Sequence, residues 1–513
     1  MRRLLPLLLA LALLTACAAP EEPDLEPEWE SYQQGLLEAE QPEPEPEEPD
    51  LPAAFTLAWQ QDQTLDPISC GEGIQEDVAS LLFEPLFRLN GEFEPQPLLC
   101  QGYGWDEAGL VCTLDLRQDV TFQDGSPLTA RDVADTLRRA AASERYGYRL
   151  RQVVSIAANR GGQVVVTLSA PNRGLPALLD IPIVKSGSEG QRVPVGTGPY
   201  RLVSENGASA LQARTDWWQG KALPVETIPL VQAKDRDTAL YLFSTRRVEL
   251  LTVDPTDDLS SVTGQAQSTS RPTSLLQFIG FNTAEGRLFA SAAARAAFSR
   301  AIPRETLVDV QLAHLALPAQ FPISPLSPLY PQDRERPYSK EDALAGLRLA
   351  GQNTGEVKEL ALLVNQEDGF RVASARFIAQ NLSLLDWKVS VQALPWEDYA
   401  AALEAGEFDL YFGEVRLTAD WDLTDLAGIG GALNYGGFTD PALDEALAAF
   451  AAGADRQAAA KRLLEAFQTA APIAPICFKS YTVLTHPGVA EGLNPAPSDT
   501  FRGLESWKIH LSP

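Results

Sequence analysis

The spacing of apolar residues along the chain switches repeatedly between the helical period and the strand period. The folded part begins near Ala53 with a short apolar strand. Residues 75–88 then place apolar side chains at helical spacing, which predicts a helix. Residues 104–123 alternate with period two, which predicts strands. Thr129, followed by Asp132 three positions later, predicts the N-terminal cap of another helix.

The same switching continues through the second half of the chain. Apolar runs predict strands over residues 274–282, 359–365, 388–395 and 408–415. Helical spacing predicts helices over residues 291–302, 339–350, 370–385, 396–405, 441–452 and 455–470. Strands that alternate with helices indicate mixed α/β layers.

Length and charge narrow the class of protein. A chain of 513 residues is too long for one ordinary core, so we expect two or three domains. The net charge is −28. Residues 1–50 contain 13 acidic residues and two arginines, so they carry −11 and the remainder carries −17. Nucleic-acid binding needs a cationic surface, and this excess of acid argues against it.

The N-terminus has the pattern of a lipoprotein signal peptide. Residues 1–16 combine two arginines with an apolar run that is too short to span a membrane. Cys17 follows directly and completes the sequence Leu-Thr-Ala-Cys, which looks like a lipobox and implies a lipid on the Cys17 sulfur. An ordinary cleaved signal with an incidental cysteine is the alternative. Residues 17–52 would then be a lipidated cysteine plus a disordered acidic Pro/Glu spacer.

The other four cysteines leave two alternatives open. They are Cys70, Cys100, Cys112 and Cys477, and no C-x-x-C spacing occurs among them. Disulfides persist outside the cytoplasm, and Cys100 and Cys112 flank a predicted hairpin that could bring them together. Buried free thiols are the other alternative.

Eight segments of the chain, taken together and in order, carry a family resemblance. They are "TLDP" (Thr64–Pro67), "LFEPLFRLNGEFEPQPLL" (Leu82–Leu99), "LDLRQDVTFQDGSPLTARDVADTL" (Leu114–Leu137), "VGTGPYRLVS" (Val195–Ser204), "FNTAEGRLFASAAARAAFSRAIPRETLV" (Phe281–Val308), "LPWEDYAAALEAGEFDLYFGEVRLTADWDLTD" (Leu394–Asp425), "FTDPALDEAL" (Phe438–Leu447) and "APIAPICF" (Ala471–Phe478). In combination they resemble the extracytoplasmic solute-binding proteins of ABC transporters, family 5, the oligopeptide, dipeptide and nickel type.

The resemblance implies an α/β fold of the periplasmic-binding-protein kind, type II, in its large three-subdomain form. Lobe 1 would comprise residues 53–270 and 480–513, with a subdomain at about 90–186. Lobe 2 would comprise residues 271–479. Two crossovers between the lobes would act as a hinge, and the ligand would bind in the cleft between the lobes.

The resemblance also implies ligand-binding residues. Asp420 falls where peptide-binding relatives pair an aspartate with the ligand ammonium, and Trp421 follows it as the retained aromatic residue. Trp396 falls where an aromatic ring lines the cleft. Arg371 falls where a relative's arginine pairs with the ligand carboxylate, and Arg376 competes for that place.

Some neighbours of Asp420 differ from the family pattern, and the others are interpreted as structural residues. Leu417 replaces an aromatic residue, and Glu414 replaces a basic residue, so a ligand carboxylate would be held differently. Asp422 and Asp425 read as residues that shape the turn or cap a helix. Arg416 is close enough in sequence to pair with Asp420.

Few residues in the sequence suggest a catalytic site or a metal site. The aspartate cluster lacks the D-x-D-x-D-G spacing of a calcium loop, and three scattered histidines suggest neither a soft-metal site nor a catalytic triad. We therefore expect no enzyme activity, no metal and no cofactor.

We expect a monomeric, lipid-anchored receptor on the outer face of the membrane that captures peptides, or another small solute, for an ABC permease and its ATPase. A surface receptor for signalling or adhesion is the alternative, as is a nickel or other solute binder of the same fold.

Overall fold

The computed structural model describes residues 50–254, 262, 265–312, 315–349, 358–383 and 387–513. Leu51–Pro513 form one compact unit, and of the unit before it only Asp50 is described. The predicted signal peptide, Cys17 and nearly all of the predicted spacer therefore lie outside the described residues. Within the described part, no helix is long and apolar enough to cross a membrane.

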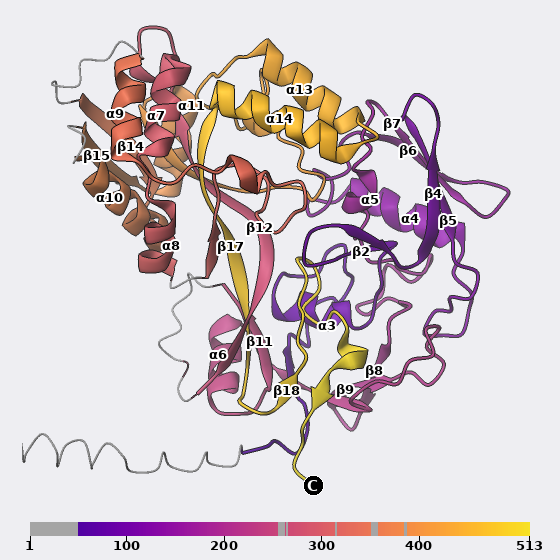
Figure 1. Ribbon diagram of the computed structural model, residues 1–513. Coiled ribbons are helices and arrows are strands. Elements are labelled where there is room, and N and C mark those ends of the chain that lie inside the picture. Colours follow the sequence, from indigo (N-terminus) through magenta and orange to yellow (C-terminus); the bar gives the residue numbers. More distant parts are fainter. Residues whose placement is uncertain (1–49, 255–261, 263–264, 313–314, 350–357, 384–386) are drawn as a thin grey trace, which may run out of the picture. The chain divides into compact units, whose positions relative to one another are not determined.

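One large mixed sheet runs through the unit (Figure 1). In sheet order its strands are β15 (Trp387–Leu394), β14 (Lys358–Asn365), β16 (Leu410–Arg416), β12 (Gln267–Phe281), β17 (Ile473–Thr485), β11 (Leu250–Val253), β1 (Leu57–Trp59), β10 (Thr227–Gln232), β9 (Ala208–Ala213) and β8 (Tyr200–Glu205). A short strand, β13 (Ala316–Pro318), pairs with β17 outside this order. The predicted mixture of strands and helices is observed, and more than half of the described strands join in this one extended sheet.

The two long strands β12 and β17 connect the two halves of this sheet. They pair antiparallel from Gln267 opposite Thr485 to Gly280 opposite Ile473. The register shifts between Pro272 and Leu276, where three residues of β12 lie opposite one residue of β17. This irregularity lies next to the predicted lobe boundaries at 270/271 and 479/480. We keep the names lobe 1 and lobe 2 for the predicted ranges, which stay a prediction.

A separate four-stranded sheet lies within the predicted subdomain 90–186. Its strands, in order, are β4 (Cys100–Trp105), β5 (Val111–Leu116), β7 (Val164–Leu168) and β6 (Val153–Ala158). Helix α4 (Ala130–Ala141) packs its apolar side chains against this sheet. The predicted cap of this helix is confirmed: the Thr129 backbone N–H donates to the Asp132 carboxylate at 2.9 Å, and the Asp132 N–H donates to the Thr129 hydroxyl.

The other helices cover the sheets. They are α3 (Ile74–Ser80), α5 (Leu175–Leu178), α6 (Arg236–Ser244), α7 (Ala292–Arg300), α8 (Arg304–Leu312), α9 (Lys340–Leu349), α10 (Gly369–Ser383), α11 (Trp396–Ala405), α12 (Thr424–Ala427), α13 (Pro441–Ala452) and α14 (Arg456–Ala470). Short strands are β2 (Phe87–Leu89), β3 (Pro95–Pro97), β18 (Ala490–Glu491) and β19 (Lys508–Ile509). Helices α13 and α14 pack side by side, as do α7 and α9 (Figure 1).

The helix predicted over residues 75–88 is wrong in its second half. Helix α3 ends at Ser80, and β2 begins at Phe87. Pro85 explains the difference, because proline has no N–H for a helix and disfavours helical backbone in the residue before it. The apolar residues between the two elements are buried in a loop instead, so their helical spacing reflects core packing.

Replacing Thr129 with alanine should lower the free energy of unfolding by about 1 kcal/mol, because α4 loses its N-terminal cap. Urea unfolding followed by circular dichroism measures the change. The matched control is Thr469→Ala, since Thr469 is exposed within α14 and its hydroxyl donates only to a helix carbonyl. Equal effects of both substitutions would contradict a capping role.

Candidate functional site

A cavity of about 280 Å³ lies where the two predicted lobes meet. Lobe 1 contributes the loop before α3, one face of α3 and the segment after α4. Lobe 2 contributes the end of β16 and the residues that follow it. The lining residues that carry charge or a thiol are Cys70, Glu72, Glu76, Arg145, Arg149, Asp180, Arg271 and Arg416.

The local backbone explains why two acids of lobe 1 reach this cavity. Gly73 precedes α3 with a φ of 77°, a left-handed conformation that glycine adopts without a steric penalty. The chain therefore turns sharply into α3. Glu72, just before the turn, and Glu76, in the first turn of the helix, both line the cavity.

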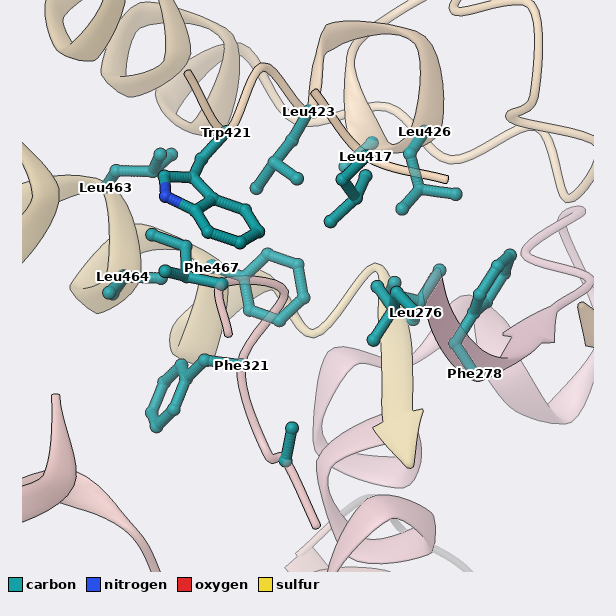
Figure 2. Packing of buried hydrophobic residues seen from close by; sticks show 14 of the residues in the cluster. Leu276, Phe278, Phe321, Leu417, Trp421, Leu423, Leu426, Leu463, Leu464 and Phe467 are labelled. Carbon is teal, nitrogen blue, oxygen red and sulfur yellow. The ribbon is translucent and has the colours of Figure 1, made fainter. Parts of the chain in front are cut away.

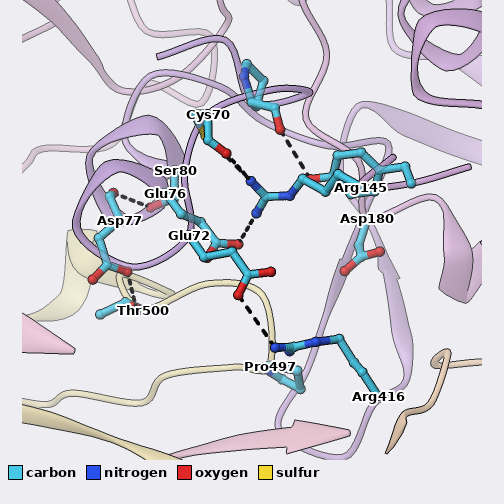
Figure 3. A network of polar contacts seen from close by, with 12 residues as sticks. Cys70, Glu72, Glu76, Asp77, Ser80, Arg145, Asp180, Arg416, Pro497 and Thr500 are labelled. Atoms are coloured by element: carbon cyan, nitrogen blue, oxygen red, sulfur yellow. Dashed lines mark hydrogen bonds and ion pairs between the residues drawn. The ribbon is translucent and has the colours of Figure 1, made fainter. Parts of the chain in front are cut away.

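Two arginines of lobe 1 have close carboxylate partners. Arg145 donates to Glu76 at 2.5 Å and also to the Cys70 carbonyl at 3.0 Å (Figure 3). Arg149 donates to Asp180 at 2.5 Å. These charges are already paired at hydrogen-bond distance, so they shape the wall of the cavity more than they attract a ligand.

Arg416, at the end of β16, is held more loosely. Its guanidinium lies 3.7 Å from the Glu72 carboxylate, beyond hydrogen-bond distance (Figure 3). It also lies 3.3 Å from the Tyr481 hydroxyl. Its side chain is 49% exposed. Both Arg416 and Glu72 can therefore exchange this contact for a better one with a ligand of complementary charge.

Arg271, on β12 at the crossing between the lobes, is the second loosely paired cation. It lies 3.8 Å from Asp77, and its buried Nε has no hydrogen-bond partner among the described residues. Burial raises the pKa of the Asp77 carboxyl above its ordinary value, although Arg271 and the Thr500 hydroxyl oppose the shift. The two terminal nitrogens of Arg271 donate to the Thr500 hydroxyl at 3.2 Å and to the Pro497 carbonyl at 3.0 Å, so the guanidinium is fixed in the cavity wall.

A second cavity of about 320 Å³ adjoins the first on the side of lobe 1. The two share Glu72, Glu76, Arg271 and Tyr481 as a common wall. It lies at the carboxyl ends of the parallel strands β1 and β11, the edge of an α/β sheet at which ligands commonly bind. Together the two cavities offer space on both sides of the same charged wall.

Asp420 is buried and faces the predicted subdomain instead of the cavity. Its Oδ2 accepts a hydrogen bond from Asn172 at 2.8 Å, and its carbonyl accepts one from Arg456 at 2.7 Å. The cavity lining ends one residue earlier, at Ala419. The ammonium-binding role of Asp420 stays a prediction.

Trp421 lies in an apolar cluster and is almost fully buried. Its indole packs against Leu463, Leu464 and Phe467 of α14 (Figure 2). It also meets Phe93 of the predicted subdomain, with ring centroids 5.1 Å apart. This position makes Trp421 a core residue, and its predicted contact with a ligand is untested.

Trp396 and Arg371 lie outside the lining of the described cavity. Trp396 begins α11 and is 58% exposed. Arg371, in the first turn of α10, pairs with Asp368 three residues earlier at 2.7 Å. The structure therefore does not gather the four predicted site residues around one described cavity.

The cavity residues that sequence reasoning missed come from distant segments. Glu72 and Arg145 carry no motif, and only the fold brings them together. Arg416 had a signal, because a charge stands at the end of an otherwise buried strand. The sequence left a pair with Asp420 open for Arg416, whereas in the structure its ion pair is with Glu72.

The four cysteines in the described chain are free and buried. In the hairpin, Cys100 lies opposite Leu116 and Cys112 lies opposite Trp105, so the register separates the two thiols. Of the two alternatives left open by the sequence, a disulfide or free thiols, the structure has free thiols. Among the described residues no group of three or more His, Cys, Asp or Glu could hold a metal ion.

Comparison with known proteins identifies related sequences and folds. The family model of bacterial extracellular solute-binding proteins, family 5, matches residues 94–434, well over half of the chain. The glutathione-binding protein GsiB of Salmonella typhi is 26% identical over 388 residues, which cover 71% of this chain and 75% of that protein.

Two solved structures share the fold. HbpA2 from Haemophilus parasuis has a TM-score of 0.73 at 21% identity and covers 90% of this chain and 100% of that one. The oligopeptide-binding protein AppA from Bacillus subtilis, solved with a nonapeptide, has a TM-score of 0.60 at 19% identity, with the same coverage. The expected periplasmic-binding-protein fold is thereby confirmed.

The buried thiols should resist modification in the folded protein. Burial raises the pKa of Cys70 to about 11, although Arg145 opposes the shift, and burial raises that of Cys477 to about 12. At pH 8 we expect Ellman's reagent to react rapidly with none of the four thiols until urea unfolds the chain. Rapid release of one equivalent from the folded Cys17→Ala variant would contradict this burial.

Proposed function

Because the chain belongs to the bacterial extracellular solute-binding proteins of family 5, which capture solutes for ABC importers, we propose that its cleft binds a short peptide with free ends. The observation that carries this proposal is the loose pair of Arg416 and Glu72 at 3.7 Å in the cavity wall. A ligand carboxylate on Arg416 and a ligand ammonium on Glu72 would replace one poor contact with two charge-assisted hydrogen bonds.

The size of the cleft supports a small peptide. Ligand pockets commonly enclose roughly 300–1,000 Å³, and the two adjoining cavities have volumes of about 280 and 320 Å³. The relatives named glutathione-binding proteins point to the same size class. Glutathione is a tripeptide with one ammonium group and two carboxylates, and Arg271 in the shared wall would favour the second carboxylate.

Replacing Arg416 with glutamine should raise the Kd for trialanine about tenfold, because the ligand carboxylate loses a partly exposed cationic partner. Isothermal titration calorimetry measures the change. Trialanine amide lacks the carboxylate, so its weaker binding should not depend on Arg416. The matched control is Arg131→Gln, which removes an 83% exposed arginine of α4 that lies outside the cavity lining.

The ammonium end is tested in the same way. Glu72→Gln should weaken trialanine binding but not the binding of N-acetyl-trialanine, which carries no ammonium. Asp420→Ala tests the site predicted from sequence, and a loss larger than that of Glu72→Gln would move the ammonium to Asp420. If neither trialanine nor glutathione binds the wild-type protein, the proposal of a peptide ligand fails.

The chain works, in this proposal, outside the cytoplasm as a monomer and performs no chemistry on its ligand. The relatives are named as binding proteins, and recovery of an intact peptide after prolonged incubation would agree with that role. We also propose that a lipid on Cys17 holds the protein at the outer face of the membrane, with the acidic residues up to 52 as a spacer.

Replacing Cys17 with alanine should release the protein from the membrane fraction into the medium or periplasm, because the thioether to the lipid cannot form. Immunoblotting of fractionated cells measures the distribution. Cys70→Ala is the matched control, since it removes a buried thiol and leaves the lipobox intact. Unchanged membrane association of the Cys17 variant would contradict the anchor.

A further inference from the structure

All three aspartates in the segment after β16 form side-chain hydrogen bonds or ion pairs with residues of the predicted subdomain. Arg151, just before β6, donates from one terminal nitrogen to Asp422 at 2.7 Å and from the other to Asp425. Asn172 donates to Asp420 at 2.8 Å. One arginine therefore bridges two carboxylates of the predicted lobe 2, more than 250 residues away in the sequence.

Further contacts surround this bridge. The Arg173 N–H donates to the Ala451 carbonyl at 2.8 Å, which joins the subdomain to the end of α13. Phe93 packs against Trp421 across the same boundary. The ion pairs of Arg151 thus form the polar edge of an interface between the subdomain and lobe 2. We call Arg151, Asp422 and Asp425 the clasp.

The clasp is continuous with the wall of the cavity. Arg416 to Ala419 line the cavity, and the next residues, from Asp420 to Asp425, contact the subdomain. A single segment of lobe 2 therefore makes the cavity wall with its first half and the clasp with its second half. A movement that separates the clasp also moves the cavity wall.

We propose that Arg151 is a positioning residue, whose ion pairs with Asp422 and Asp425 favour the closed cleft before any ligand enters. Arg151 does not itself line the described cavity, although its guanidinium lies over the ring of the lining residue Tyr148, 4.7 Å from the centroid. It acts on binding through the equilibrium between open and closed protein. Ligand affinity rises with the fraction of binding-competent protein, and the clasp sets part of that fraction.

The size of the effect is bounded by solvent exposure. The side chain of Arg151 is 30% exposed, and those of Asp422 and Asp425 are 19% and 23% exposed. Partly exposed ion pairs contribute less than buried ones, and salt screens them. We expect removal of the clasp to change the ratio of open to closed protein about threefold to tenfold.

The test measures the ligand-free protein, so it does not depend on the identity of the ligand. Nitroxide labels are attached to cysteines introduced at exposed Glu107, in the subdomain, and exposed Ala448, on α13, in a chain with Cys17→Ala. Pulsed electron paramagnetic resonance then gives the distribution of distances between the labels. Arg151→Gln should increase the long-distance population, whereas Arg131→Gln should leave it unchanged.

A double-mutant cycle separates the clasp from a general loss of stability. Asp425 pairs with Arg151, so Asp425→Asn should shift the distances in the same direction as Arg151→Gln but by less, because the pair of Arg151 with Asp422 remains. The double variant should shift them no further than Arg151→Gln alone, because Arg151→Gln already removes both ion pairs. Raising the salt to 1 M should open the wild-type protein and leave Arg151→Gln unaffected.

Each outcome decides the proposal. Identical distance distributions for wild type and Arg151→Gln overturn it, and so do additive shifts in the double variant. A lower melting temperature with unchanged distances also overturns it, because it assigns Arg151 a structural role only. Failure of every peptide to bind would overturn the proposed ligand and leave this measurement intact.

Discussion

The pairing of β12 with β17 is the constraint on which the rest of the structure depends. Both strands are long, at 15 and 13 residues, and each belongs to both halves of the large sheet. Their hydrogen-bond ladder is interrupted after Pro272, where three residues of β12 lie opposite Lys479. The Thr273 hydroxyl donates to the Lys479 carbonyl at 2.5 Å, so the irregular backbone keeps a hydrogen-bond partner. A bulge bends a ladder without breaking the strands, and this bulge lies next to the predicted boundary between the lobes.

The charges of the cleft follow from this geometry. Thr273 and Ser274 of the bulge line the first cavity beside Arg271, which lines both cavities. Lys479, almost fully buried at the same level, lies 3.1 Å from Asp254 and 3.6 Å from Glu414. That lysine is neutralised within the protein, whereas Arg271 and Arg416 keep distant partners. The difference in pairing, rather than the number of cations, determines which groups have free capacity for an anionic ligand.

The sequence predicted the elements better than the site. Helices over 396–405 and 441–452 and the cap at Thr129 are confirmed because their signals are local: proline or a capping side chain before a regular apolar stripe. The helix predicted over residues 75–88 is wrong in its second half because Pro85 disfavours helical backbone in spite of the helical spacing of the apolar residues. The cleft could not be derived in this way. Its acids and arginines come from segments far apart in the sequence, and Arg416 reaches Glu72 only after the chain has crossed between the lobes. No local pattern encodes such a meeting.

The aspartate turn shows how the backbone decides what a motif can do. Trp421 has a φ of 60°, a left-handed conformation that costs of order 1–3 kcal/mol in a residue other than glycine. Burial of its indole against α14 offsets that cost and fixes the direction of the flanking carboxylates.

Asp420 packs closely against Gly174. A Cβ added to this glycine would lie 2.5 Å from the Cβ of Asp420. Asn172 donates to Oδ2 of this carboxylate at 2.8 Å, and Oδ1 lies 3.4 Å from the Asp422 backbone nitrogen. A carboxylate accepts several hydrogen bonds, so a ligand that pairs with Asp420 would share it with Asn172 and would have to fit against the subdomain.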